Sequence, residues 1–166
     1  MLLCVFLLSG CKAQGDIRET VNDFVPEHQQ VWTEKSYDFI FGVPEGMTET
    51  FSRDDWTCYE EQNGGLEVYT VKLLSSSVNS SVKLISGTDP EKLYIVESSR
   101  FSLPEYKFCW CAHSDEGARV YYADIVIDDI YTYGLVCSAP EERWKRYSEQ
   151  TETVFSTFGL FFDEGV

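Results

Sequence analysis

The chain has 166 residues, of which 43% are hydrophobic and 15% aromatic, and its formal net charge at pH 7 is −15. Because each aromatic side chain can bury roughly 150–250 Å², this composition predicts a packed core. The length suits one domain of about 150 residues behind an export segment. The negative charge repels nucleic-acid phosphates and anionic lipid headgroups, so it excludes nucleic acid as a partner and membrane binding by charge. The acidity is typical of a soluble surface; the alternative is attraction of cations or of a basic partner.

The first ten residues, MLLCVFLLSG, predict an export signal peptide. The apolar run Leu2–Leu8 is shorter than the ~20 residues that span a bilayer, and small residues follow it. The segment Leu8-Ser9-Gly10-Cys11 resembles the bacterial lipobox. That resemblance implies that the Cys11 thiol receives a diacylglycerol and that cleavage leaves Cys11 as the new N-terminus. The alternatives are an ordinary secretory signal cleaved near Ala13 and a buried N-terminal strand.

Residues 11–35 are polar and predict a tether between the lipid and the domain, either as a plain linker or with a short helix near Ile17–Phe24. Residues 36–166 predict a single globular domain. A chain anchored in this way lies on the extracytoplasmic side of the cell membrane. The segments after residue 11 are not apolar enough to form a transmembrane helix.

Alternating apolar and polar residues indicate β-strands along the domain. The predicted strands are Tyr37–Phe41, Trp56–Gln62, Leu66–Leu74, Tyr106–His113, Val120–Ile127 and Ile130–Cys137. Turn sequences lie between them at Pro44-Glu45-Gly46, Asn63-Gly64-Gly65, Asp115-Glu116-Gly117 and Asp128-Asp129. We predict a loop at Ser75–Ser81, candidate strands at Val82–Ile85 and Leu93–Val96, and a candidate helical turn at Pro90-Glu91-Lys92.

Tight pairing of the last three strands distributes their side chains over two faces. One face is apolar and is expected to pack against a helix: Phe108, Trp110, Tyr121, Ala123, Ile125, Ile130 and Val136. The other face is mixed and is expected to be partly wet: Cys109, His113, Tyr122, Asp124, Tyr131, Tyr133 and Cys137.

A C-terminal amphipathic helix is predicted to start after Ser138, which is a suitable N-cap with Pro140 in the first turn and Glu141 as its capping-box partner. Gly159 is expected to end it. The apolar stripe of this helix is Trp144, Tyr147, Thr151, Val154, Phe155 and Phe158. The expected fold class is therefore α+β, an antiparallel β-sheet with the C-terminal helix packed on one face.

These elements together resemble the PsbP-like sandwich. The segment Phe39–Gly46, FIFGVPEG, resembles the opening strand and turn of that family, although Met47 stands where a Trp usually follows. The closing segment Val154–Phe158, VFSTF, resembles the family's ending, with Thr157 inserted into the usual Ser-Phe pair. The resemblance covers roughly residues 37–162. It implies an antiparallel sheet with helices packed on it and a role in binding other proteins, and it offers no shared catalytic residues.

The sequence offers few candidate ligands for a metal or a cofactor. The two histidines, His28 and His113, are far apart in sequence, whereas zinc usually needs three or four convergent ligands. Asp124, Asp128 and Asp129 lie near one hairpin without the spacing of a calcium loop, and we interpret them as part of a solvated turn. We therefore expect no metal and no cofactor.

Four cysteines lie in the domain: Cys58, Cys109, Cys111 and Cys137. Free, half-buried thiols and one disulfide are both compatible with an exported chain. Cys109, Cys111 and His113 share one predicted strand and form the candidate set for nucleophilic catalysis. We expect a membrane-anchored, non-catalytic binding or scaffold module with an unidentified protein partner at the cell envelope. The alternative is a cell-surface enzyme that uses the Cys109, Cys111 and His113 strand.

Overall fold

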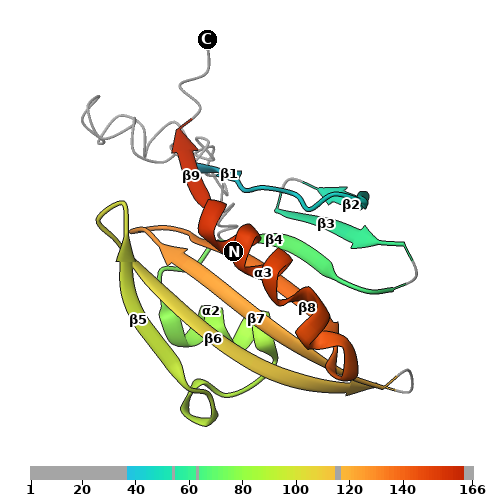
Figure 1. The fold of residues 1–166 in the computed structure, drawn as a ribbon. Helices are drawn as coiled ribbons and strands as arrows, with labels where there is room; N and C mark the ends of the chain where they lie inside the picture. Colours follow the sequence, from blue (N-terminus) through green and yellow to red (C-terminus); the bar gives the residue numbers. More distant parts are fainter. Residues whose placement is uncertain (1–36, 54, 63, 115–116, 163–166) are drawn as a thin grey trace, which may run out of the picture. The chain divides into compact units, whose positions relative to one another are not determined.

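A computed structural model of the chain describes residues 37–53, 55–62, 64–114 and 117–162. They form a seven-stranded antiparallel sheet in the order β2-β3-β4-β8-β7-β6-β5, and a separate pair of strands, β1 and β9 (Figure 1). The strands are β1 Tyr37–Ile40, β2 Met47–Arg53, β3 Trp56–Glu61, β4 Glu67–Leu73, β5 Ile95–Arg100, β6 Leu103–Ser114, β7 Gly117–Ile127, β8 Thr132–Pro140 and β9 Gly159–Phe162. The helices are α2 Val78–Ser86 and α3 Ser148–Thr157, with 3-10 segments η2 Pro90–Lys92 and η3 Glu141–Tyr147.

One helix covers each face of the large sheet (Figure 1). Helix α2 packs its fully buried Val82 against one face, with Phe108, Trp110, Ala123, Ile125, Ile127 and Val136. Helix α3 packs Val154 and the following Phe158 against the other, with Leu66, Val68, Val126, Leu135, Cys137 and Ala139. Each helix buries its apolar stripe on a different side of the same strands, so this part of the chain has three layers.

The apolar face predicted for the last three strands is confirmed, because Phe108 pairs with Ala123 and Ala123 with Val136 across β6, β7 and β8. Ile130 is the exception, since it lies in the turn before β8. The helix on this face is α2, whereas the C-terminal helix α3 covers the mixed face. The expectation that the mixed face is partly wet is therefore wrong for Asp124, Tyr133 and Cys137, which are buried, and Asp124 is not part of a solvated turn.

The predicted loop Ser75–Ser81 and the candidate strand Val82–Ile85 are wrong, because most of both segments belongs to α2. The side chain of Ser77 caps this helix by accepting a hydrogen bond from the amide of Ser80. Gly87 ends it in the left-handed conformation at φ 68°, which a glycine adopts at little cost.

The predicted start of the C-terminal helix at Ser138 is also wrong. Strand β8 continues to Pro140, and Ser138 is a fully buried strand residue whose hydroxyl donates to Oε2 of Glu67 at 2.7 Å. The 3-10 segment η3 follows, and α3 begins only at Ser148. Strands β2 and β9 were not predicted; β9 pairs with β1, with Phe39 opposite Leu160.

Candidate functional site

A cleft of about 280 Å³ lies beside α3, on the face of the sheet that this helix covers. Its lining is mainly aromatic and aliphatic, and comes from the region of β5, β6 and β7 and from α3: Tyr94, Val96, Lys107, Phe108, Cys109, Tyr122, Ala123, Asp124 and Phe155. We call it the Asp124 cleft. Tyr94 and Val96 stand at its rim and are 82% and 45% exposed. The volume is near the lower end of the range for small-molecule sites.

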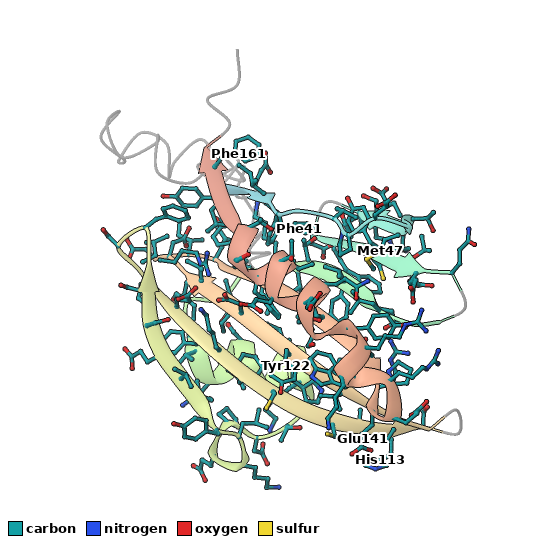
Figure 2. The ribbon with its side chains drawn as sticks, in the orientation of Figure 1. Phe41, Met47, His113, Tyr122, Glu141 and Phe161 are labelled. Atoms are coloured by element: carbon teal, nitrogen blue, oxygen red, sulfur yellow. The ribbon has the colours of Figure 1, made fainter. Side chains whose placement is uncertain are left out.

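Strand register brings the polar groups of the cleft together. Lys107 pairs with Asp124 across β6 and β7, and Cys109 pairs with Tyr122 two residues away. Because paired residues point to the same face, all four side chains lie under or beside α3. The ring of Tyr122 is stacked on Trp144 of η3, with centroids 4.6 Å apart and planes at 11°; Figure 2 shows Tyr122 beside the lower part of the C-terminal helix.

Four charged residues form a cluster, and two of them, Lys107 and Asp124, line the floor of the cleft. The guanidinium of Arg100 donates from Nε to Oε1 of Glu105 at 2.6 Å and from Nη2 to Oδ2 of Asp124 at 3.0 Å. Its Nη1 donates to the carbonyl oxygen of Phe158, at the C-terminal end of α3, at 2.6 Å. The Lys107 ammonium lies 3.5 Å from Glu105 and 3.7 Å from Asp124. The cluster therefore ties β5, β6 and β7 to the end of α3.

The two carboxyl groups of the cluster differ in proton affinity. Burial and repulsion from Glu105 raise the pKa of Asp124 to about 7, against the attraction of Lys107 and Arg100. Burial also penalises ionised Glu105, but hydrogen bonds from Ser98 and Arg100, together with the positive charges of Arg100 and Lys107, outweigh that penalty and lower the pKa of Glu105. Asp124 is 1% exposed, and its Oδ1 has no hydrogen-bond partner among the described residues. A titratable group with a strongly shifted pKa in a cleft is typical of a functional site.

The structure does not assemble the predicted set of Cys109, Cys111 and His113 into a catalytic group. The three residues alternate along β6 and are exposed. Alternate strand residues are about 7 Å apart, so His113 lies roughly 13 Å along the strand from Cys109, which lines the cleft. Figure 2 shows His113 near the end of the sheet. Within the described ranges, no hydrogen bond joins the imidazole to either thiol.

The four cysteines of the domain are free thiols in the structure. Cys109 and Cys111 are exposed, whereas Cys58 and Cys137 are buried. Burial raises the pKa of both buried thiols, and the carboxylates of Glu60 and Glu67 raise that of Cys58 further.

The acidic turn between β7 and β8 forms hydrogen bonds within the chain. Oδ1 of Asp128 accepts from the amides of Ile130 and Tyr131, at 2.7 and 2.5 Å, and Oδ2 accepts from the hydroxyl of Tyr133 at 3.1 Å. Asp124 is not part of this turn, because it belongs to the charged cluster with Arg100, Glu105 and Lys107 on the side of the sheet that α3 covers. In the part of the chain that the structure describes, no group of three or more His, Cys, Asp and Glu side chains is placed to hold a metal ion.

Several predicted features lie outside the described residues: the signal peptide 1–10, the lipobox with Cys11, the tether 11–35, and His28. Among the described helices, none is long and apolar enough to cross a bilayer.

Sequence reasoning placed Asp124 on the mixed face but did not identify Arg100, Glu105 or Lys107 as its partners. One signal was available, since Asp124 is the single charge within the apolar stretch Ala123–Ile127. A buried carboxyl group needs a compensating cation or a proton. The partner could not be chosen, because Arg100 lies 24 residues away in the chain.

The fold is similar to that of solved proteins, although no family model and no curated protein matches the sequence. LpqN, described as involved in cell envelope biogenesis of Mycobacterium tuberculosis, aligns with 8% identity and a TM-score of 0.54 over 78% of this chain and 86% of its own. Cyanobacterial PsbP (CyanoP) from Synechocystis aligns with 13% identity and a TM-score of 0.55 over 77% of this chain and 92% of its own. A Bacteroides thetaiotaomicron protein aligns with 10% identity and a TM-score of 0.51 over 77% of this chain, which spans only 46% of that protein. The described part of the chain therefore has the PsbP-like fold, as the resemblance of its sequence to that family predicts.

Proposed function

We propose that this chain is an extracytoplasmic lipoprotein, anchored in the cell membrane through Cys11, whose PsbP-like domain is a non-catalytic binding module for a protein at the cell envelope. The lipobox supports the anchor. The shared fold with LpqN, a protein involved in cell envelope biogenesis, supports the location. The observation that carries the binding role is the open Asp124 cleft, which has an aromatic rim and a charged floor.

The composition of the cleft favours binding over catalysis. Its exposed rim residue Tyr94 and the stacked ring of Tyr122 belong to the residue types that dominate protein interfaces. Its one thiol, Cys109, has no hydrogen-bonded base within the described residues, and nucleophilic catalysis by a thiol needs such a base or another activating group. A partner that covers the rim would exclude water from the charged floor and strengthen its interactions.

The anchor is tested by Cys11→Ala. Two or three acyl chains hold a protein firmly on a membrane, at roughly 0.8 kcal/mol for each buried CH₂, and a net charge of −15 offers no substitute. We expect the variant to leave the membrane fraction or to accumulate as an uncleaved precursor. The matched control is Cys111→Ala, which removes an exposed thiol of the domain and should remain anchored. A wild-type N-terminus at Gln14, or a Cys11→Ala protein that is still processed and membrane-bound, would contradict the anchor.

The binding role is tested by crosslinking in intact cells. A photoreactive residue replaces Tyr94 at the rim of the cleft, and the control position is Thr48, which is exposed on the strand β2 at the opposite edge of the sheet. We expect one discrete crosslinked protein from position 94 and none from position 48. No product, or the same products from both positions, would count against a partner at the cleft.

A further inference from the structure

A second groove, of about 440 Å³, lies on the opposite face of the sheet, beside α2. Trp56 and Tyr69 lie on its floor, on the neighbouring strands β3 and β4. Leu84 and Ile85 of α2 and Tyr121 of β7 form its far wall. We call it the Trp56 groove. Its size is typical of pockets for small molecules.

Two aromatic rings meet at a right angle in this groove. Trp56 and Tyr69 have centroids 6.4 Å apart and an interplanar angle of 88°. Phe51 of β2 supports the indole from the adjacent strand at 4.7 Å. Trp56 remains 42% exposed although it is held by these neighbours. The exposed part of Trp56 gives the floor of the groove an aromatic surface, and aromatic ring faces attract cations because they carry negative charge density.

Two carboxylates stand at one end of the groove, where Glu60 and Glu67 are directly opposite each other on β3 and β4. Groups within the chain compensate the negative charge of one of them, Glu67. Arg119 lies 2.9 Å from Oε1 of Glu67, and the hydroxyl of Ser138 donates to its Oε2 at 2.7 Å. Like charges in direct opposition destabilise a strand pair, so the compensation of Glu67 has a clear structural role.

Glu60 has no such compensation. It accepts hydrogen bonds from the hydroxyl of Thr50 at 3.0 Å and from the thiol of Cys58 at 3.8 Å, both at Oε1. Among the described residues it forms no ion pair, and no lysine or arginine lines the groove. This end of the groove therefore keeps one net negative charge, roughly 13 Å along β3 from Trp56 at the other end.

We propose that the Trp56 groove binds a small organic cation, with its ammonium group at Glu60 and its apolar body along Tyr69, Trp56 and Leu84. An anionic ligand would meet the carboxylate of Glu60 and a chain of net charge −15. A neutral apolar ligand would desolvate Glu60 without replacing its lost water. The site is separate from the Asp124 cleft and from the anchor, so it goes beyond the proposed function and stands independently of it.

The first test compares a cation with a neutral molecule of the same shape. Benzyltrimethylammonium and its carbon isostere, neopentylbenzene, are titrated into the full chain and followed by the amide and indole signals of β3, β4 and α2 in NMR spectra. We expect the cation to bind about tenfold more tightly, with shifts at Trp56 and Tyr69. Equal affinity of the two probes, or shifts outside the groove, would overturn the proposal.

The second test removes the charge. Glu60→Gln keeps the shape and the acceptor for Thr50, and should weaken cation binding about tenfold. Glu152→Gln is the matched control, because it makes the same change at an exposed position on α3, across the sheet. Equal losses in both variants, or none in Glu60→Gln, would overturn the proposal. Nα-acetyl-lysine amide, which carries the side-chain ammonium group of a lysine in a protein, is titrated in parallel. Tighter binding of this probe than of benzyltrimethylammonium would favour a protein side chain as the ligand and would overturn the assignment to a small molecule.

Discussion

Replacing Asp124 with Asn removes the titrating carboxyl at the floor of the Asp124 cleft and nearly preserves its shape. The pKa of this carboxyl is about 7 in the folded chain, against an ordinary value of 3.8. A raised pKa means that the folded chain binds the proton more tightly than the unfolded chain. The resulting contribution to stability is complete below pH 3.8 and is lost as the pH rises through about 7. Asn binds no proton, so the variant lacks this pH dependence.

The expected magnitude follows from linkage. For a shift from 3.8 to about 7, the wild-type free energy of unfolding should fall by about 2 kcal/mol relative to the variant between pH 5.5 and pH 8. Solvent screening reduces this figure little, because the side chain is 1% exposed. Other groups that titrate in this range are present in both proteins and cancel in the difference.

Urea unfolding followed by tryptophan fluorescence at several pH values measures the effect. The quantity of interest is the wild-type free energy of unfolding minus that of Asp124→Asn, with m-values that stay constant. Asp129→Asn is the matched control, because Asp129 is exposed in the turn between β7 and β8 and the difference should stay flat. If the difference for Asp124→Asn is constant within about 0.5 kcal/mol, or changes only below pH 5, the pKa of Asp124 is not raised and the reasoning fails.

Three further outcomes are expected. Glu105→Gln should destabilise the fold by about 2–3 kcal/mol at pH 7, because it removes the buried negative charge that strengthens the hydrogen bonds from Arg100 and Ser98; a loss below 0.5 kcal/mol in urea would show that the ion cluster contributes little. Gly134→Ala should cost about 1–3 kcal/mol, because its Cβ would lie 2.7 Å from Cγ1 of Val71; an unchanged thermal midpoint would contradict this crowding. A maleimide should label Cys109 in the folded chain and Cys137 only in urea, as read by peptide mapping, since their exposures differ; labelling of folded Cys137 would contradict its burial.

Strand periodicity was most informative where consecutive strands are also neighbours in the sheet. Strands β6, β7 and β8 follow one another in the chain and pair in that order, so the turns between them determine the register. Strand β9 has no such local partner. It pairs with β1, and Tyr37 is opposite Phe162 at the far end of the domain sequence. Its four residues become a strand through that distant pairing.

The helix α2 shows why composition alone was misleading. Its sequence VNSSVKLIS is rich in serine and β-branched residues, which have low helix propensity. Burial outweighs that propensity, because Val82 is completely enclosed against the sheet. The available signals were the cap residues Ser77 and Gly87 and the spacing of Val78, Val82 and Ile85, which places three apolar side chains on one helix face.

Ser138 illustrates a local signal overruled by a distant partner. A serine followed by Pro140 and Glu141 is typical of a helix start. The strand β7 extends back to Gly117, however, and its residue Arg119 pairs with Pro140, so β8 must continue past Ser138. The Ser138 hydroxyl then forms its hydrogen bond with Glu67, 71 residues away, which no local pattern reveals.

An interaction between residues that are distant in the sequence also explains which helix covers which face of the sheet. An apolar face accepts any apolar helix stripe, and α2 meets that need with Val82. The half-buried guanidinium of Arg100 also lies on this side of the sheet, and it needs an acceptor beyond its carboxylate partners. The C-terminal end of a helix supplies free carbonyl groups and a partial negative charge, and Arg100 donates to the carbonyl of Phe158 at the end of α3. The Phe158 ring also lies 5.1 Å from the guanidinium. A C-terminal helix on this face therefore provides both the apolar stripe and the acceptor that completes the charged floor of the Asp124 cleft.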